Sequence, residues 1–173
     1  KAVTLNMNDM LINLLKMLRL RGGPQNMSTS WALMICLLAA YLAQNLFTGQ
    51  QFEDENLAVK SLLVVFLQVV ALTGLLFWRR HLERFVQTMS ALTAVGIFFN
   101  AITGALLSVS DPTVNQPILA MVWFAVFIWS LFVDAHIYRN SLSVPYAVGM
   151  LVTVLVLAAS YVFIEMVFLL GNP

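Results

Sequence analysis

The side chains in this sequence best suited to bind a divalent metal are His81, Glu83, Asp134 and His136. Imidazole nitrogens and carboxylate oxygens are common ligands of zinc. The spacing fits no established ligand signature, because the two pairs come from different parts of the chain. The alternative is that the two acids form interfacial ion pairs with nearby arginines. These arginines are Arg79, Arg80, Arg84 and Arg139. We therefore expect a charge cluster here and no metal site.

Two polar residues, Gln68 and Glu165, lie inside long apolar stretches. A charged side chain within a membrane span is costly and often belongs to an ion or substrate path. Glu165, however, lies a few residues from the end of its stretch, where its carboxylate can reach the lipid headgroups. Gln68 lies nearer to the middle, where an amide usually bonds to a neighbouring helix. We expect interfacial and packing roles, with transport or proton handling by Glu165 as the alternative.

Two stripes of small and polar residues follow helical spacing. Gly96, Asn100 and Gly104 lie four residues apart in one apolar segment. Small residues at this spacing let two helices approach closely, and an amide can form a hydrogen bond across the contact. A similar stripe in the last segment consists of Gly149, Thr153 and Ser160. Both stripes predict helix packing or partner contact, with a polar site at mid-membrane as the alternative for the first.

No catalytic signature accompanies these residues. The sequence lacks GxSxG, HExxH and P-loop motifs, and Cys36 is its only cysteine, so paired thiols are absent too. No histidine lies deep in an apolar segment, so a haem held by two histidines is not expected. The basic segments are too short to form a nucleic-acid surface. We expect no enzyme activity, no cofactor and no nucleic-acid partner.

The composition identifies the environment that must position these residues. Hydrophobic residues make up 61% of the 173-residue chain and charged residues only 10%. A soluble domain is about half apolar and about a quarter charged. A soluble protein of this size could not bury so much apolar surface, because its core is limited by its ratio of surface to volume. Lipid must cover the remainder.

Five apolar segments are each long enough to cross a bilayer once. A spanning helix needs roughly 20 apolar residues. The segments cover residues 28–47, 57–78, 85–109, 117–138 and 145–170, and polar or basic turns separate them. Within lipid a helix satisfies its own backbone hydrogen bonds, and the period-two alternation of a barrel strand is absent. The sequence therefore predicts an all-α fold, a polytopic membrane bundle of five transmembrane helices.

Lysine and arginine are unevenly distributed about these segments. If the chain crosses five times, eight of its nine lysines and arginines fall on one side, and only Lys60 falls on the other. Basic residues prefer the cytoplasmic side, which predicts a cytoplasmic N-terminus and an external C-terminus. If one segment did not cross, the basic residues after it would change sides and the asymmetry would be lost.

The N-terminal residues 8–20 follow a different pattern. Leucines recur there at helical spacing, while Lys16 and Arg19 occupy other positions. This pattern is typical of an amphipathic helix lying in the membrane interface. Packing on the cytoplasmic end of the bundle is an equal alternative, and both can hold. The chain thus divides into two parts, an amphipathic cytoplasmic segment at residues 1–24 and the transmembrane domain at residues 25–173.

The run Arg21-Gly22-Gly23-Pro24-Gln25, followed by five spans, resembles the Yip1 family. The resemblance covers nearly the whole chain in layout, although the long soluble N-terminal region of eukaryotic members is absent. Compact bacterial proteins of unknown role share this layout. The resemblance implies a small non-enzymatic membrane protein that acts through partners, and it carries over no site residues.

Two functions are compatible with these features. The first is a scaffold, accessory or assembly subunit of a larger membrane complex, because the chain combines small-residue stripes with almost no mass outside the membrane. The expected partners are the lipid bilayer and other membrane proteins or further copies of the chain, in a bacterial inner membrane. The alternative is a small oligomeric transporter or channel with Gln68, Asn100 and Glu165 along its path.

Overall fold

The protein is all-helical in the residues that the structure describes. The computed structural model describes residues 7–49, 56–111 and 115–171. The elements are, in chain order, α1 (Met7–Leu18), the 3-10 helix η1 (Pro24–Asn26), α2 (Trp31–Gly49), α3 (Leu57–Trp78), the 3-10 helix η3 (Leu82–Arg84), α4 (Phe85–Ser108), α5 (Pro117–Leu142) and α6 (Tyr146–Gly171). The predicted all-α fold is confirmed.

In the described part of the chain, five helices, α2 to α6, are long and apolar enough to cross a membrane. Their outward surfaces carry large apolar side chains. Phe66 of α3 is 60% exposed, for example, and Ile118 of α5 is 78% exposed. In water such exposure would be unfavourable, because burying one large apolar side chain stabilises a protein by roughly 1.5–3 kcal/mol relative to leaving it exposed. The five predicted segments are therefore helices with the length, composition and surface of membrane spans.

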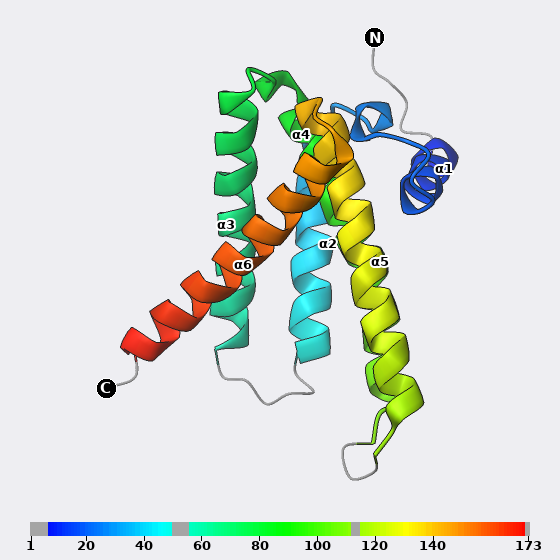
Figure 1. Ribbon diagram of the computed structural model, residues 1–173, viewed down its shortest axis with the longest axis vertical. Helices are drawn as coiled ribbons and strands as arrows, with labels where there is room; N and C mark the ends of the chain where they lie inside the picture. The colour runs from blue at the N-terminus through cyan, green and yellow to red at the C-terminus, as the bar shows by residue number, and fades with distance from the viewer. Residues whose placement is uncertain (1–6, 50–55, 112–114, 172–173) are drawn as a thin grey trace.

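Successive long helices run in opposite directions, so their connections alternate between the two ends of the bundle (Figure 1). One end carries residues 19–30, 79–84 and 143–145, and we call it the basic end. Among the described residues it holds Lys16, Arg19, Arg21, Arg79, Arg80, Arg84 and Arg139. The opposite end carries residues 109–111 and the start of α3, which includes Lys60. Among the described residues, Lys60 thus lies at one end of the bundle and the other lysines and arginines lie at the opposite end, as the five-segment prediction requires.

Helix α4 forms the centre of the bundle. Residues 88–95 are all buried, and α4 packs against both α2 and α5. Phe98 and Phe99 meet the ring of Trp129 on α5 edge to face, with centroids 5.8 and 5.1 Å apart. Aromatic pairs favour this geometry. Helices α3 and α6 lie at the periphery of this core (Figure 1).

Helix α1 packs on the bundle at the basic end. Met17 and Leu18 are buried, whereas Leu11 and Leu15 remain about half exposed. The indole Nε1 of Trp129 donates a hydrogen bond to the carbonyl oxygen of Leu18 at 3.1 Å. The predicted packing of this segment on the bundle is therefore observed, and its exposed leucines leave an apolar side available to lipid.

Helix α5 continues beyond its predicted end. We expected the span to stop near Tyr138, but the helix extends to Leu142. The last carbonyls of a helix have no partner within it. Here the guanidinium groups of Arg79 and Arg84 donate hydrogen bonds to four of these terminal carbonyl oxygens, at residues 140–143. The polar residues near the end of α5 are therefore helical, because distant arginines satisfy its terminus.

Three helices end at the basic end with a residue in the left-handed backbone conformation. These residues are Leu20, Arg80 and Ser143, with φ of 58°, 58° and 53°. In α3, the N–H of His81 then donates to the carbonyl oxygen of Leu76 at 2.8 Å. This is a Schellman closure, which usually contains glycine at the left-handed position. Each of the three side chains adds a steric cost that glycine would avoid.

Candidate functional site

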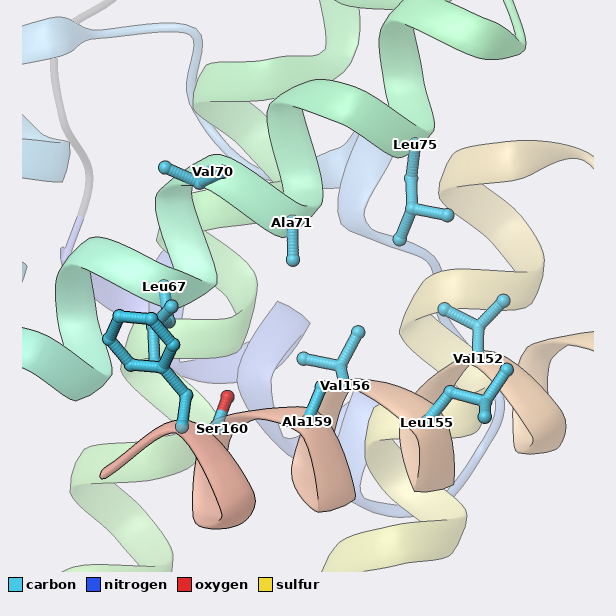
Figure 2. A pocket seen from close by; sticks show the side chains of 10 residues that line it. Leu67, Val70, Ala71, Leu75, Val152, Leu155, Val156, Ala159 and Ser160 are labelled. Atoms are coloured by element: carbon cyan, nitrogen blue, oxygen red, sulfur yellow. The ribbon is translucent and has the colours of Figure 1, made fainter. Parts of the chain in front are cut away.

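An apolar groove lies between α3 and α6 (Figure 2). Its volume is about 410 Å³, and Ser160 supplies the one hydroxyl among its lining residues. The other lining residues are Leu67, Val70, Ala71, Leu75, Val152, Leu155, Val156, Ala159 and Phe163. Both helices are long and apolar enough to span a membrane, so in a membrane the groove would face the lipid interior. It offers packing surface and one hydroxyl, and no set of groups for catalysis.

The groove exists because α6 is held at its start and then leaves the bundle obliquely (Figure 1). A Cβ atom on Gly149 would lie 2.5 Å from the carbonyl oxygen of Ala135 and 3.0 Å from the amide nitrogen of Arg139. Glycine therefore permits a close crossing of α5 and α6 at this point. Farther along, the short side chains of Ala71 and Ala159 leave space between α3 and α6.

The first predicted stripe lies in the contact between α4 and α2. The Cβ position of Gly96 is 2.9 Å from the ring of Tyr41, and that of Gly104 is 3.7 Å from the hydroxyl of Thr48. Between them, the amide of Asn100 donates to the side-chain oxygen of Asn45 at 3.2 Å. These residues occupy a helix contact inside the chain, so Asn100 faces α2.

The second predicted stripe is divided between different neighbours. Gly149 contacts α5, as described above, and the buried hydroxyl of Thr153 donates to the carbonyl oxygen of Gly149 at 3.0 Å. Ser160 lies two turns farther along and lines the groove facing α3. The spacing on the helix is as predicted, but the oblique course of α6 gives its two halves different partners.

Gln68 and Glu165 do not join Asn100 in a common polar site. Gln68 is half-buried on α3, and Glu165 is exposed near the end of α6. Asn100 is engaged with Asn45 in the α2–α4 contact. Among the described residues, these three side chains share no hydrogen bond. The three residues therefore have separate surroundings within the described chain.

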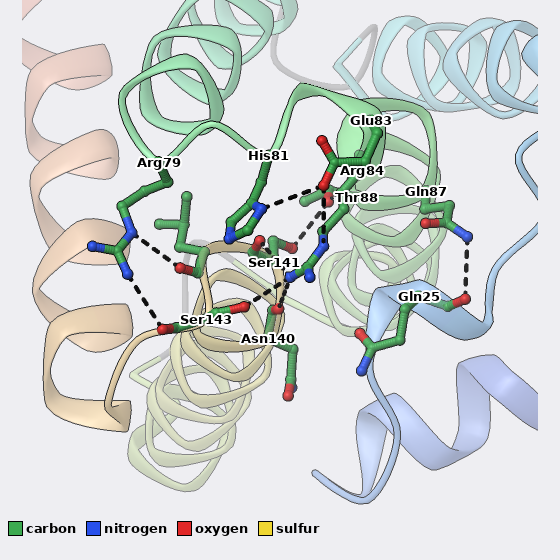
Figure 3. A network of polar contacts seen from close by, with 11 residues as sticks. Gln25, Arg79, His81, Glu83, Arg84, Gln87, Thr88, Asn140, Ser141 and Ser143 are labelled. Atoms are coloured by element: carbon green, nitrogen blue, oxygen red, sulfur yellow. Dashed lines mark hydrogen bonds and ion pairs between the residues drawn. The ribbon is translucent and has the colours of Figure 1, made fainter.

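Arg79 and Arg84 connect two turns of the basic end (Figure 3). Arg79 donates from Nε to the carbonyl oxygen of Leu142 at 3.2 Å. Arg84 donates from Nη1 to the carbonyl oxygens of Asn140 and Ser141, both at 3.2 Å, and to a nearby serine hydroxyl at 2.8 Å. Cations at a helix C-terminus interact favourably with its dipole. Arg79 and Arg84 of the predicted charge cluster therefore cap the C-terminus of α5, which is a structural role.

The remaining members of the predicted cluster do not converge on a metal site. His81 Nδ1 lies 3.3 Å from a carboxylate oxygen of Glu83, whereas the ring of His136 is buried and its Nε2 lies 2.9 Å from the carbonyl oxygen of Gly22. Within the described residues, no three histidine, cysteine or acidic side chains are grouped as metal ligands. The two histidines thus serve different contacts.

The expected ion pair of Asp134 is wrong, whereas that of Glu83 is observed. A carboxylate oxygen of Glu83 lies 3.8 Å from Nε of Arg84. Asp134 forms no ion pair with any arginine in the described chain, and it interacts electrostatically with Tyr41 and Tyr138. The reason is geometric for Arg79 and Arg84, because they bind the end of α5 and Asp134 lies two turns before that end.

Sequence reasoning missed the groove and the partners of the arginines. Leu67, Ala71 and Leu75 recur every four residues on α3, and that spacing does identify one helix face. It cannot identify the helix that this face meets, because the crossing angle depends on contacts elsewhere. Carbonyl groups that accept hydrogen bonds from arginine leave no signal in the residue types at all.

The chain matches no known protein family, no curated protein and no solved structure. Its function is therefore argued from the arrangement of its helices and side chains.

Proposed function

We propose that this chain is a non-enzymatic membrane protein that acts as an accessory or assembly subunit of a larger membrane complex. The groove between α3 and α6 carries the proposal. Its occupant would be one apolar transmembrane helix of another membrane protein. The lining is almost entirely apolar, and the only hydroxyl in it belongs to Ser160. These are the properties of a packing surface.

A partner helix fits the chemistry of the groove better than a polar substrate does. Helices associate in membranes through close packing, and small residues allow their backbones to approach. Ala71 and Ala159 supply short side chains on the two walls, and the hydroxyl of Ser160 can form a hydrogen bond across the contact. We expect a partner segment with small residues facing the groove.

We further propose that the basic end faces the cytoplasm of a bacterial cell and that the protein belongs to the inner membrane. The support is the preference of lysine and arginine for the cytoplasmic side of a membrane. We also propose a Yip1-like role through partners, as the resemblance of residues 21–25 and the spans implies.

Site-specific photocrosslinking tests the proposed partner. A photoreactive amino acid replaces Ala71 in the groove or, as a control, the exposed Val122 on α5. We expect the Ala71 position to form one adduct with another membrane protein in cells, and the Val122 position to form none. Adding Ala159→Phe, which fills the groove, should abolish the adduct while the protein remains in the membrane.

Three results would contradict the proposal. The first is equal crosslinking from both positions, and the second is an adduct that survives Ala159→Phe. The third is an adduct at twice the 19.3 kDa mass of the chain, which would assign the groove to a second copy. Purification in mild detergent gives an independent check, and a lone monodisperse monomer would count against a stable complex.

A further inference from the structure

A polar cavity opens at the basic end between η1, the start of α4 and the turn joining α5 to α6. Its volume is about 340 Å³. The lining residues are Gln25, Arg84, Arg139, Asn140, Ser143 and Val144. Figure 3 shows Gln25 across from Asn140 and Ser143. Five of the six side chains are polar, which distinguishes this cavity from the groove between α3 and α6.

The charge that faces the cavity is positive. Arg139 is exposed, and no described residue forms a hydrogen bond or ion pair with its guanidinium group. Arg84 uses Nη1 for its bonds to the end of α5, which leaves Nη2 without a hydrogen bond in the described chain. The nearby acid is Glu83, and its carboxylate is shared between Arg84 Nε at 3.8 Å and His81 at 3.3 Å.

The end of α5 does not cancel this positive charge. Carbonyl groups at a helix C-terminus would repel an anion. Here those of residues 140–143 already accept hydrogen bonds from Arg79 and Arg84. The hydroxyl oxygen of Ser143 also accepts from Arg84, at 2.8 Å, so its own O–H is free to donate. Arg139, Arg84 and Ser143 all line the cavity, and each retains a hydrogen-bond donor.

The position of the cavity indicates the ligand. Phe85 begins α4, Leu142 ends α5 and Tyr146 begins α6, so the cavity lies where three membrane spans end. This is the depth of lipid headgroups. Arginine binds phosphate through parallel charge-assisted hydrogen bonds. Basic pockets between transmembrane helices bind anionic headgroups in the same way.

We propose that this cavity binds a phosphate group carrying net negative charge, contributed by an anionic phospholipid headgroup or by a small soluble phosphate ester. Arg139 and Arg84 are the binding residues. Ser143 and the amide of Gln25 complete the hydrogen bonds to the phosphate oxygens. The site is independent of the groove between α3 and α6, so it stands whether or not a partner helix binds there.

Native mass spectrometry of the full-length protein in detergent tests the site, with phosphatidylglycerol added as the anionic lipid and phosphatidylcholine as the zwitterionic one. Arg139→Gln is the main variant, because the Arg139 side chain forms no hydrogen bond with a described residue whose loss would disturb the fold. Arg80→Gln is the matched control, since it also removes an exposed charge from the same end but outside the cavity. Equal unfolding temperatures verify that both variants are folded.

We expect Arg139→Gln to weaken phosphatidylglycerol binding about tenfold, which corresponds to one charge-assisted contact. Arg80→Gln should change it by less than about twofold, as for a screened surface charge. Arg139→Lys should be intermediate, because lysine keeps the charge and loses the paired geometry. Phosphatidylcholine should bind more weakly than phosphatidylglycerol.

Adding glycerol 3-phosphate or inorganic phosphate identifies the source of the ligand. If either displaces the lipid, the cavity takes soluble phosphates, and if neither does, it takes the lipid headgroup. Equal weakening by Arg139→Gln and Arg80→Gln would overturn the proposal, because it would indicate general attraction to a basic surface. Equal binding of both lipids by the unmodified protein would overturn it as well.

Discussion

Single residues decide where the helices of this bundle touch. The Cβ position of Gly149 lies 2.5 Å from the carbonyl oxygen of Ala135, whereas no atom lies within 4 Å of the Cβ position of Gly74. The first glycine is a contact point between two helices, and the second faces open space. Both lie within apolar segments, so the type of residue alone does not distinguish them.

Gly149→Ala should destabilise the protein and Gly74→Ala should not. An added methyl group at position 149 must displace the backbone of α5, and overpacking of this kind costs about 1–3 kcal/mol. At position 74 the methyl group meets nothing, and alanine favours a helix over glycine by up to about 1 kcal/mol. Thermal unfolding in detergent measures the difference. A Gly149→Ala protein as stable as Gly74→Ala would show that α5 and α6 do not meet closely at Gly149.

At the scale of elements, hydropathy predicts the existence of the helices better than it predicts their ends. Lipid fixes the length of a span, so the five segments could be read from apolar runs alone. The end of α5 could not, because it depends on Arg79 and Arg84, which lie more than fifty residues earlier in the chain. The expected ion pair of Asp134 failed for a related reason, since Arg79 and Arg84 bind the end of α5 and Asp134 lies two turns before that end.

The left-handed residue at the end of α3 allows a further prediction. Arg80 is exposed and ends α3 in the left-handed conformation, with φ of 58°. Arg80→Gly and Arg80→Val both remove its charge, but only glycine tolerates this backbone. Valine is branched at Cβ and should be less stable than glycine by about 1–2 kcal/mol. Chemical or thermal unfolding of the two variants, compared with the unmodified protein, gives the difference. Equal stability would mean that α3 does not end in a Schellman closure.

At the scale of the whole molecule, the sequence predicts that successive helices run in opposite directions. It does not predict the angles between them. The separation of basic residues follows from the number of crossings, which is why charge and hydropathy agree. The groove depends instead on the oblique course of α6 after its close crossing at Gly149. Small residues mark a face that allows close approach, as Ala71 and Ser160 do, but they do not specify which helix approaches or whether a space remains.

Because successive helices run in opposite directions, the fold predicts which residues are accessible from each side of a membrane. With Cys36 replaced by alanine, a single cysteine can be placed at Glu83, just before α4, or at Asn115, between α4 and α5. The two positions lie on either side of α4 in the chain, and both are exposed. In right-side-out vesicles, an impermeant maleimide should label Asn115→Cys directly and Glu83→Cys only after permeabilisation. The charge asymmetry is the reason, because the basic end should face the cytoplasm. Labelling of both positions from the same side would show that α4 does not cross the membrane. The reverse pattern would keep the five crossings and overturn the orientation, since the basic end would then face outward.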